Sequence, residues 1–178
     1  MRFVPLAAAT ALAPAAAFAV DYLSAEQAAK LLFPEATRFE ARELSLDAAA
    51  LQRLQAQGVS ARSQHWRVQA ALAGADLLGW VVVDDVIGKF ELISYAVGIT
   101  REGRLKPVEV LSYRESHGHE IRLPAWRRQF EGKTAAAPLR VGDDIANISG
   151  ATLSCTHVTD GVRRIAVLVD WARREGRL

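Results

Sequence analysis

The middle of the chain consists of short runs rich in Val, Ile, Leu and aromatic residues, a pattern typical of β-strands. The runs cover residues 66–70, 78–86, 91–100 and 106–113. Short polar segments with glycine separate them, and such links favour antiparallel neighbours. We therefore predict an antiparallel sheet of about four or more strands.

Hydrophobic residues at helical spacing flank this region on both sides. Residues 24–33 begin with the capping-box sequence Ser24-Ala25-Glu26-Gln27 and stop at Pro34, and residues 46–57 stop at Gly58. The longest apolar stripe follows Leu153 and consists of Val158, Val162, Ile165, Val169 and Ala172. Together these elements predict a single domain of the α+β class, with the helices packed on one face of the sheet.

The first residues have the features of a secretory signal peptide. Residues 1–3 provide a short basic start, residues 4–16 are apolar and rich in Ala, and Ala17-Phe18-Ala19 fits the cleavage rule for small residues. We expect cleavage after Ala19, which leaves a mature domain of residues 20–178 in the bacterial periplasm. The apolar run is short for a membrane span, so we expect no membrane-spanning segment after cleavage.

Charge and cysteine content narrow the function classes further. The chain has 22 Lys and Arg residues against 20 Asp and Glu residues, and this near balance argues against nucleic-acid binding. Cys155 is the single cysteine, so no disulfide can form within the chain. Near a helix start its thiol is either activated or simply a small buried group.

The last predicted helix opens with the sequence Ser149-Gly150-Ala151-Thr152-Leu153-Ser154, which combines hydroxyls with small residues. The amino end of a helix carries about half a positive charge and several unpaired backbone N–H groups, so it can serve as a binding site for a phosphate. An ordinary helix start capped by Ser149 or Thr152 is the alternative interpretation.

Residues 115–120, with the sequence Glu-Ser-His-Gly-His-Glu, form a second informative segment. Its two His and two Glu residues suggest metal binding at first sight. A zinc site, however, usually needs three or four converging ligands, and His65 and His157 lie far away in the sequence. We therefore expect no metal site, and a plain surface loop remains the alternative to a ligand-binding role.

The segment 149–154 resembles the flavinylation motif of the FMN-binding domain family. This domain occurs in the flavin-bearing subunits of the sodium-translocating quinone reductase and of its ferredoxin-oxidising relative. Further similarity lies at residues 22–34, 86–89, 113–121, 126, 129–133 and 158–163. The resemblance implies FMN as the cofactor. In that family a transferase that uses FAD joins FMN through a phosphoester to the threonine at the position of Thr152.

The resemblance also implies which residues bind the cofactor. They are Thr152 with Ser149, Gly150, Ala151, Leu153 and Ser154, and Glu115, Gly118 and His119 over the flavin. Trp126 either lines the ring pocket or packs in the core with Phe130. Family members usually carry Asp where this chain has Ala146, so covalent attachment and tight non-covalent binding both remain open.

These features predict a periplasmic flavoprotein that carries electrons. The flavin supplies the redox chemistry, so we assign no catalytic residue to the protein itself. The expected partners are the flavin transferase and membrane-embedded or periplasmic redox proteins. Two alternatives remain, a flavin-dependent reductase with His119 or Glu115 as proton donor and a cofactor-free interaction module of the same fold.

Overall fold

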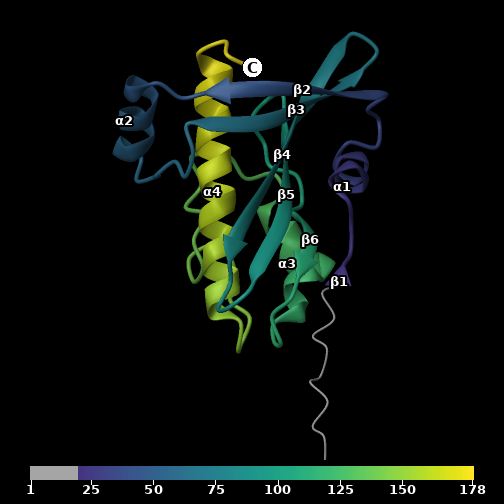
Figure 1. Ribbon diagram of the computed structural model, residues 1–178, viewed down its shortest axis with the longest axis vertical. Helices are drawn as coiled ribbons and strands as arrows, with labels where there is room; N and C mark the ends of the chain where they lie inside the picture. The colour runs from purple at the N-terminus through teal and green to yellow at the C-terminus, as the bar shows by residue number, and fades with distance from the viewer. Residues whose placement is uncertain (1–19) are drawn as a thin grey trace, which may run out of the picture.

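A six-stranded antiparallel sheet runs through the centre of the computed structural model, which describes residues 20–178 (Figure 1). The predicted signal peptide, residues 1–19, lies outside the described residues. The strand order is β1-β6-β5-β4-β3-β2. The strands are β1 (Val20–Asp21), β2 (Arg38–Ser45), β3 (His65–Ala73), β4 (Asp76–Ile87), β5 (Leu92–Thr100) and β6 (Glu109–Tyr113).

The long helix α4 (Thr152–Arg174) lies along one face of the sheet and packs on β4 and β5 (Figure 1). Its apolar stripe is buried against the main hydrophobic core, as the spacing predicts. The other helical segments are α1 (Ala25–Leu32), α2 (Ala48–Ala56), η1 (His119–Arg122), α3 (Pro124–Arg127) and η2 (Arg128–Phe130). No helix within residues 20–178 is long and apolar enough to cross a membrane.

The predicted α+β class with an antiparallel sheet is confirmed, and one detail differs from the expectation of helices on one face. Helix α1 packs on the opposite face, where its Leu32 joins Ala71, Val81 and Ala96 in a second buried cluster. The central strands are apolar on both faces, because successive side chains of a strand point to opposite sides. Two layers of helix therefore cover the sheet.

The four predicted strands correspond to β3, β4, β5 and β6, whereas the two-residue β1 and the edge strand β2 were not predicted. Strand β2 has the sequence Arg-Phe-Glu-Ala-Arg-Glu-Leu-Ser, and only Leu44 in it is buried. It pairs with β3 at the edge of the sheet, so most of its side chains face solvent. The charged sequence of an exposed edge strand lacks the apolar run by which the other strands are recognised.

Gly161 sets the distance between α4 and the sheet. A Cβ atom at this position would lie 1.9 Å from the hydroxyl oxygen of Tyr95 on β5. The Tyr95 hydroxyl donates a hydrogen bond to the carboxylate of Asp84 (3.1 Å), which also pairs with Arg164 of α4 (3.4 Å). Closer to the amino end of α4, Nδ1 of His157 lies 2.6 Å from the carbonyl oxygen of Ile87, which places this end beside the turn that joins β4 to β5.

Candidate functional site

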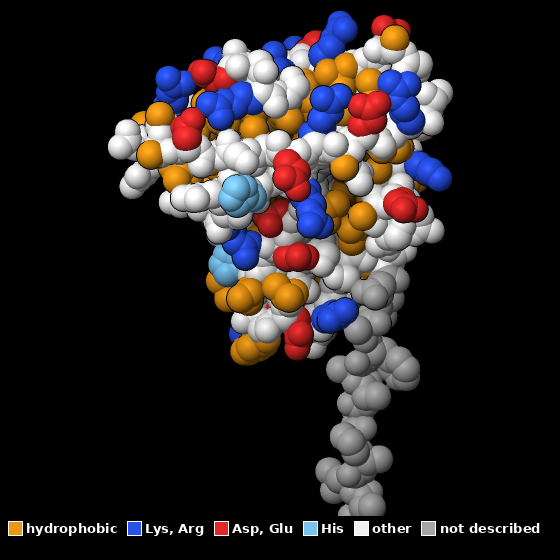
Figure 2. All heavy atoms as spheres, turned by 45° about the horizontal axis from the view of Figure 1, so that its top comes forward, with side chains coloured by type: hydrophobic (Ala, Val, Ile, Leu, Met, Phe, Trp, Pro, Cys, Tyr) orange, Lys and Arg blue, Asp and Glu red, His pale blue; other side chains and the backbone are white. Residues whose placement is uncertain are grey.

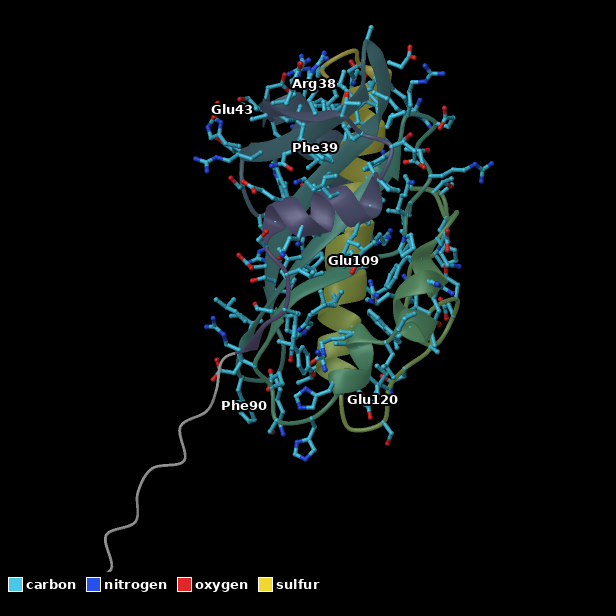
Figure 3. All side chains as sticks on the ribbon, turned by 90° about the vertical axis from the view of Figure 1, so that its right-hand side faces the viewer. Arg38, Phe39, Glu43, Phe90, Glu109 and Glu120 are labelled. Atoms are coloured by element: carbon cyan, nitrogen blue, oxygen red, sulfur yellow. The ribbon has the colours of Figure 1, made fainter. Side chains whose placement is uncertain are left out.

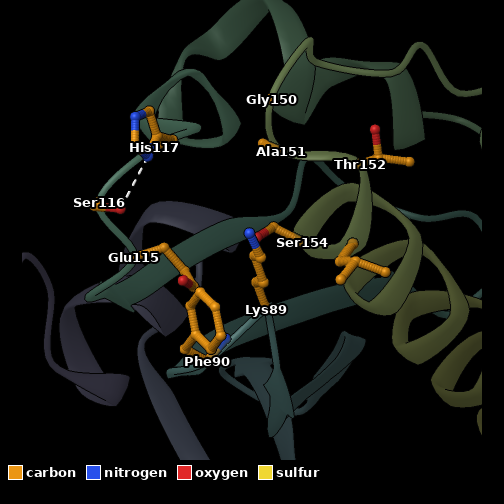
Figure 4. A pocket seen from close by; sticks show the side chains of 10 residues that line it. Lys89, Phe90, Glu115, Ser116, His117, Gly150, Ala151, Thr152 and Ser154 are labelled. Carbon is orange, nitrogen blue, oxygen red and sulfur yellow. Dashed lines mark hydrogen bonds between the residues drawn. The ribbon is translucent and has the colours of Figure 1, made fainter.

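Three chain segments meet in an open cleft at the amino end of α4 (Figure 4). The cleft has a volume of about 370 Å³. It is lined by Lys89, Phe90, Glu115, Ser116, His117, Gly150, Ala151, Thr152, Leu153 and Ser154. Six of the ten residues expected to bind the cofactor therefore line one cavity, together with four residues that the sequence did not predict.

The start of α4 lacks the side-chain cap of the alternative interpretation, an ordinary capped helix start. Ala151 is the N-cap residue, and neither Ser149 nor Thr152 caps the helix with its side chain. Thr152 is instead the first helical residue, and its Oγ1 accepts a hydrogen bond from Nδ2 of Asn147 (3.0 Å). Gly150 makes the preceding turn with φ +81°. The first backbone N–H groups of α4, at the edge of the cleft, thus have no side-chain cap. Such groups can donate hydrogen bonds to a bound anion.

Glu115 lies behind the β4–β5 turn and is only 7% exposed. Its Oε1 accepts hydrogen bonds from the backbone N–H groups of Phe90 (2.7 Å) and Glu91 (3.0 Å). Burial acts to raise the pKa of Glu115, but these amide hydrogen bonds outweigh it, and the pKa lies below its usual value. The carboxylate is therefore charged at neutral pH and engaged with the turn.

Tyr113 connects the other two segments of the cleft. Its hydroxyl donates to the carbonyl oxygen of His117 (2.5 Å) and shares a hydrogen bond with the buried hydroxyl of Ser154 (3.2 Å). Burial raises the pKa of Tyr113, so the phenol keeps its proton for this bridge. The Oγ atom of Ser116 and Nδ1 of His117 are also hydrogen-bonded (2.9 Å; Figure 4).

Four expected binding residues do not line the cleft. Gly118 has φ +85°, and a Cβ atom there would lie 2.2 Å from Cβ of Ala151, so it permits close packing behind the cleft. His119 contacts the Tyr113 ring edge-on, with ring centroids 5.6 Å apart. Ser149 comes just before the segment 150–154 but does not line the cleft itself. Trp126 lines a different hollow.

Trp126 supports the segment that leads to the cleft. Its ring packs edge-on against Phe130 (5.2 Å), and its Nε1 donates to the carbonyl oxygen of Ala146 (2.9 Å). It lines a separate hollow that also contains Ile148. This geometry matches the core alternative, because the side chain is buried among neighbours rather than open to the cleft.

The sequence missed the contribution of the β4–β5 turn to the cleft. Lys89 points from this turn into the cleft, and Phe90 lies beside it with 75% of its surface exposed (Figures 3 and 4). Ile87 and Leu92, at the ends of the two strands that this turn joins, are exposed as well. Figure 2 shows hydrophobic side chains gathered at the lower end of the face it presents. An aromatic residue directly after the predicted turn at residues 87–89 was the available signal for this part of the site.

Cys155 directly follows Ser154, which lines the cleft, but is itself fully buried. Burial raises the pKa of its thiol, so the environment does not activate it. Within residues 20–178, no three His, Cys, Asp or Glu side chains are grouped so that they could hold a metal ion. The chemistry available in the cleft is thus anion binding by amides and Lys89 and ring stacking on Phe90.

Comparison with known proteins shows what this chain is similar to. The model of the FMN-binding domain family matches residues 88–167, which confirms the resemblance seen in the sequence and implies FMN as the cofactor. The structure is similar to the crystal structure of NqrC from Shewanella oneidensis. The TM-score is 0.57 at 16% identity, over 79% of this chain and 84% of that chain, which shows a common fold. The comparison with curated proteins gave no match.

Proposed function

We propose that this protein is an electron-transfer flavoprotein that holds FMN in the cleft at the amino end of α4. The observation that carries the proposal is the meeting of the segment 150–154 with Lys89, Phe90 and Glu115 around one cavity, inside the part of the chain that matches the FMN-binding domain. Its volume of about 370 Å³ falls within the range of sites for small molecules and cofactors.

The residues of the cleft fit the two halves of FMN. The amides of the first turn of α4 have no side-chain cap, and Lys89 adds a positive charge nearby, so a phosphate would be stabilised there. Phe90 offers an exposed aromatic ring, a suitable surface for a planar ring system. When bound, the flavin would supply the redox chemistry, and the protein would supply its binding and electrostatic environment.

We further propose that FMN is attached to Thr152, whose side chain is exposed at the edge of the cleft. Attachment would form a bond between Thr152 Oγ1 and the FMN phosphorus of FAD and break the bond from that phosphorus to the AMP phosphate. AMP leaves, and the hydroxyl proton passes to the transferase or to solvent. A covalent link would retain the cofactor in a compartment where free FMN is scarce and a reversibly bound cofactor is lost by mass action.

Export to the periplasm belongs to the same proposal, with the signal peptide of residues 1–19 removed. There the flavin transferase and periplasmic or membrane-embedded redox proteins would be the partners. Cell fractionation of the full chain, with the N-terminal residue of the product determined by mass spectrometry, tests the location. A product that retains Met1 and stays in the cytoplasm would contradict it.

Intact-mass measurement tests the attachment directly. We expect the protein co-expressed with a flavin transferase to gain the mass of one FMN unit and to become yellow. Thr152→Ala removes the acceptor oxygen and should abolish the gain, whereas Ser149→Ala, a hydroxyl outside the cleft lining, should keep it. Yellow protein without the added mass would show that FMN is bound non-covalently. Colourless wild-type protein with no affinity for added FMN would refute the proposed function.

A further inference from the structure

We propose that Glu115 is a positioning residue, which holds the β4–β5 turn so that Lys89 and Phe90 face the cofactor cleft. This inference rests on the proposed function and replaces the expectation that Glu115 contacts the flavin itself. The carboxylate would act on the cofactor through the two side chains that the turn presents to the cleft.

The first observation is the pair of hydrogen bonds that ends on one carboxylate oxygen. The backbone N–H groups of Phe90 and Glu91 both donate to Oε1 of Glu115, at 2.7 and 3.0 Å. The turn itself is closed by a hydrogen bond from the amide of Gly88 to the carbonyl oxygen of Glu91 (2.8 Å). A buried carboxylate is tolerated because such donors replace its lost water.

The second observation is the close packing of Gly88 between the turn and the cleft. A Cβ atom at Gly88 would lie 2.5 Å from Oε1 of Glu115 and 3.1 Å from Oγ of Ser154. Because Gly88 has no side chain, the β4–β5 turn can pack closely against both the Glu115 carboxylate and the first turn of α4. Any movement of Glu115 away from the turn would open a gap at this point.

The third observation concerns the side chains that the turn carries. Phe90 is 75% exposed, so its neighbours hold it little and its backbone largely determines where the ring lies. The ammonium group of Lys89 lies 4.9 Å from the centroid of the Phe90 ring. Because the Phe90 amide is one of the two that Glu115 binds, the position of both side chains depends on this carboxylate.

Amide hydrogen exchange in the protein without cofactor tests the structural half of the inference. Glu115→Gln keeps the shape but removes the charge, and the amides of Phe90 and Glu91 should then exchange about tenfold faster. That factor corresponds to about 1.4 kcal/mol, comparable to one charge-assisted hydrogen bond. Glu91→Gln makes the same charge change on an exposed neighbouring residue and should leave exchange unchanged. Unchanged exchange in Glu115→Gln would overturn the inference.

FMN binding to protein made without the transferase tests the functional half. Glu115→Gln should weaken binding about tenfold in the wild-type background and by less than about twofold in a Phe90→Ala, Lys89→Ala background, because the residues through which it acts are gone. Equal losses in both backgrounds would mean that Glu115 contacts FMN directly and would overturn the inference. Glu115→Asp, which keeps the charge on a shorter side chain, should show an intermediate loss and provides the second variant if Glu115→Gln does not fold.

The two proposals fail in different ways. A wild-type protein with no FMN affinity and no attached FMN would refute the proposed function, and the exchange rates of the Phe90 and Glu91 amides would still decide whether Glu115 holds the turn. Normal FMN binding by Glu115→Gln would refute the positioning role alone.

Discussion

At the scale of single residues, Thr152 is held in place by a neighbour outside the segment 149–154. Nδ2 of Asn147 donates to Thr152 Oγ1, which occupies one lone pair of the hydroxyl oxygen and favours one rotamer of the side chain. The hydroxyl proton stays available to a base. Asn147 directly follows Ala146, the position at which the chain departs from the usual motif of the family.

We therefore expect Asn147→Ala to slow the attachment of FMN to Thr152 about fivefold, the effect of one hydrogen bond of about 1 kcal/mol. The rate would be measured by intact mass with purified transferase and FAD. Asn147→Asp can accept the hydroxyl proton and should attach FMN at least as fast as Asn147→Ala. Asn147 and Thr152 are both exposed, so the melting temperatures of the two variants and of the wild type should agree within about 2 °C. Equal rates for wild type and Asn147→Ala would contradict the assigned role.

Much of the cleft was predictable at this scale, and the exceptions have a common cause. The segment 150–154 and Glu115 belong to short motifs that can be read locally. Lys89 and Phe90 enter the cleft only because β4 and β5 pair along their length and bring their turn to the start of α4. No local pattern reports such a meeting of distant segments.

At the scale of elements, the contact of α4 with β5 depends on Gly161. A glycine inside a helix usually costs about 1 kcal/mol relative to alanine. Here the space for a methyl group is already taken by the hydroxyl of Tyr95, 1.9 Å from the site of a Cβ atom. The helix thus gives up intrinsic stability so that it can pack closely on the sheet.

Gly161→Ala should lower the free energy of unfolding by roughly 1–3 kcal/mol despite the better helix propensity, because the core is overpacked. Urea unfolding of Gly161→Ala, Tyr95→Phe and the double variant measures this. We expect the double variant to lose less free energy of unfolding than the two single losses added together. The reason is that Tyr95→Phe removes the hydroxyl oxygen, which is the atom nearest to the new Cβ. A more stable Gly161→Ala protein would show that the helix can shift without cost.

The sequence predicted elements well where one apolar pattern dominates. The capping box over Ser24 and Gln27 is present, and α2 ends just before Gly58, as expected. The position of α1 on the opposite face was not predicted, because a strand such as β4 that is buried on both sides gives no sign of which helix covers which face. Strand β2 was missed for the opposite reason, its exposure.

At the scale of the whole molecule, the connection from η2 to α4 determines where the segment 149–154 lies. This connection covers residues 131–151 and contains little regular structure. Leu139 and Ile145 anchor it in the main core. The carboxylate of Asp144 holds it further, accepting from the amide of Arg140 (2.9 Å) and pairing with Lys133 (3.0 Å).

The charge of Asp144 makes this anchoring sensitive to acid. Burial acts to raise the pKa of Asp144, but the amide of Arg140 and the ammonium of Lys133 outweigh it and lower the pKa below its usual value. An unfolded Asp has a pKa of about 3.9. A folded pKa below that value means that Asp144 stabilises the fold above about pH 5, and that this contribution is lost as the pH falls through the folded pKa.

Asp144→Asn should therefore be less stable than wild type at pH 7, and its stability should fall less steeply between about pH 5 and pH 2. Asp143→Asn is the matched control, because Asp143 is an exposed neighbour with a long contact of 3.6 Å to Arg140, and it should follow the wild-type curve. Glu115 has a pKa lowered in the same direction, so some acid sensitivity should remain in both variants. Parallel curves for wild type and Asp144→Asn would show that the anchoring of the connection does not depend on this charge, and that Leu139 and Ile145 hold the segment 149–154 in place by packing alone.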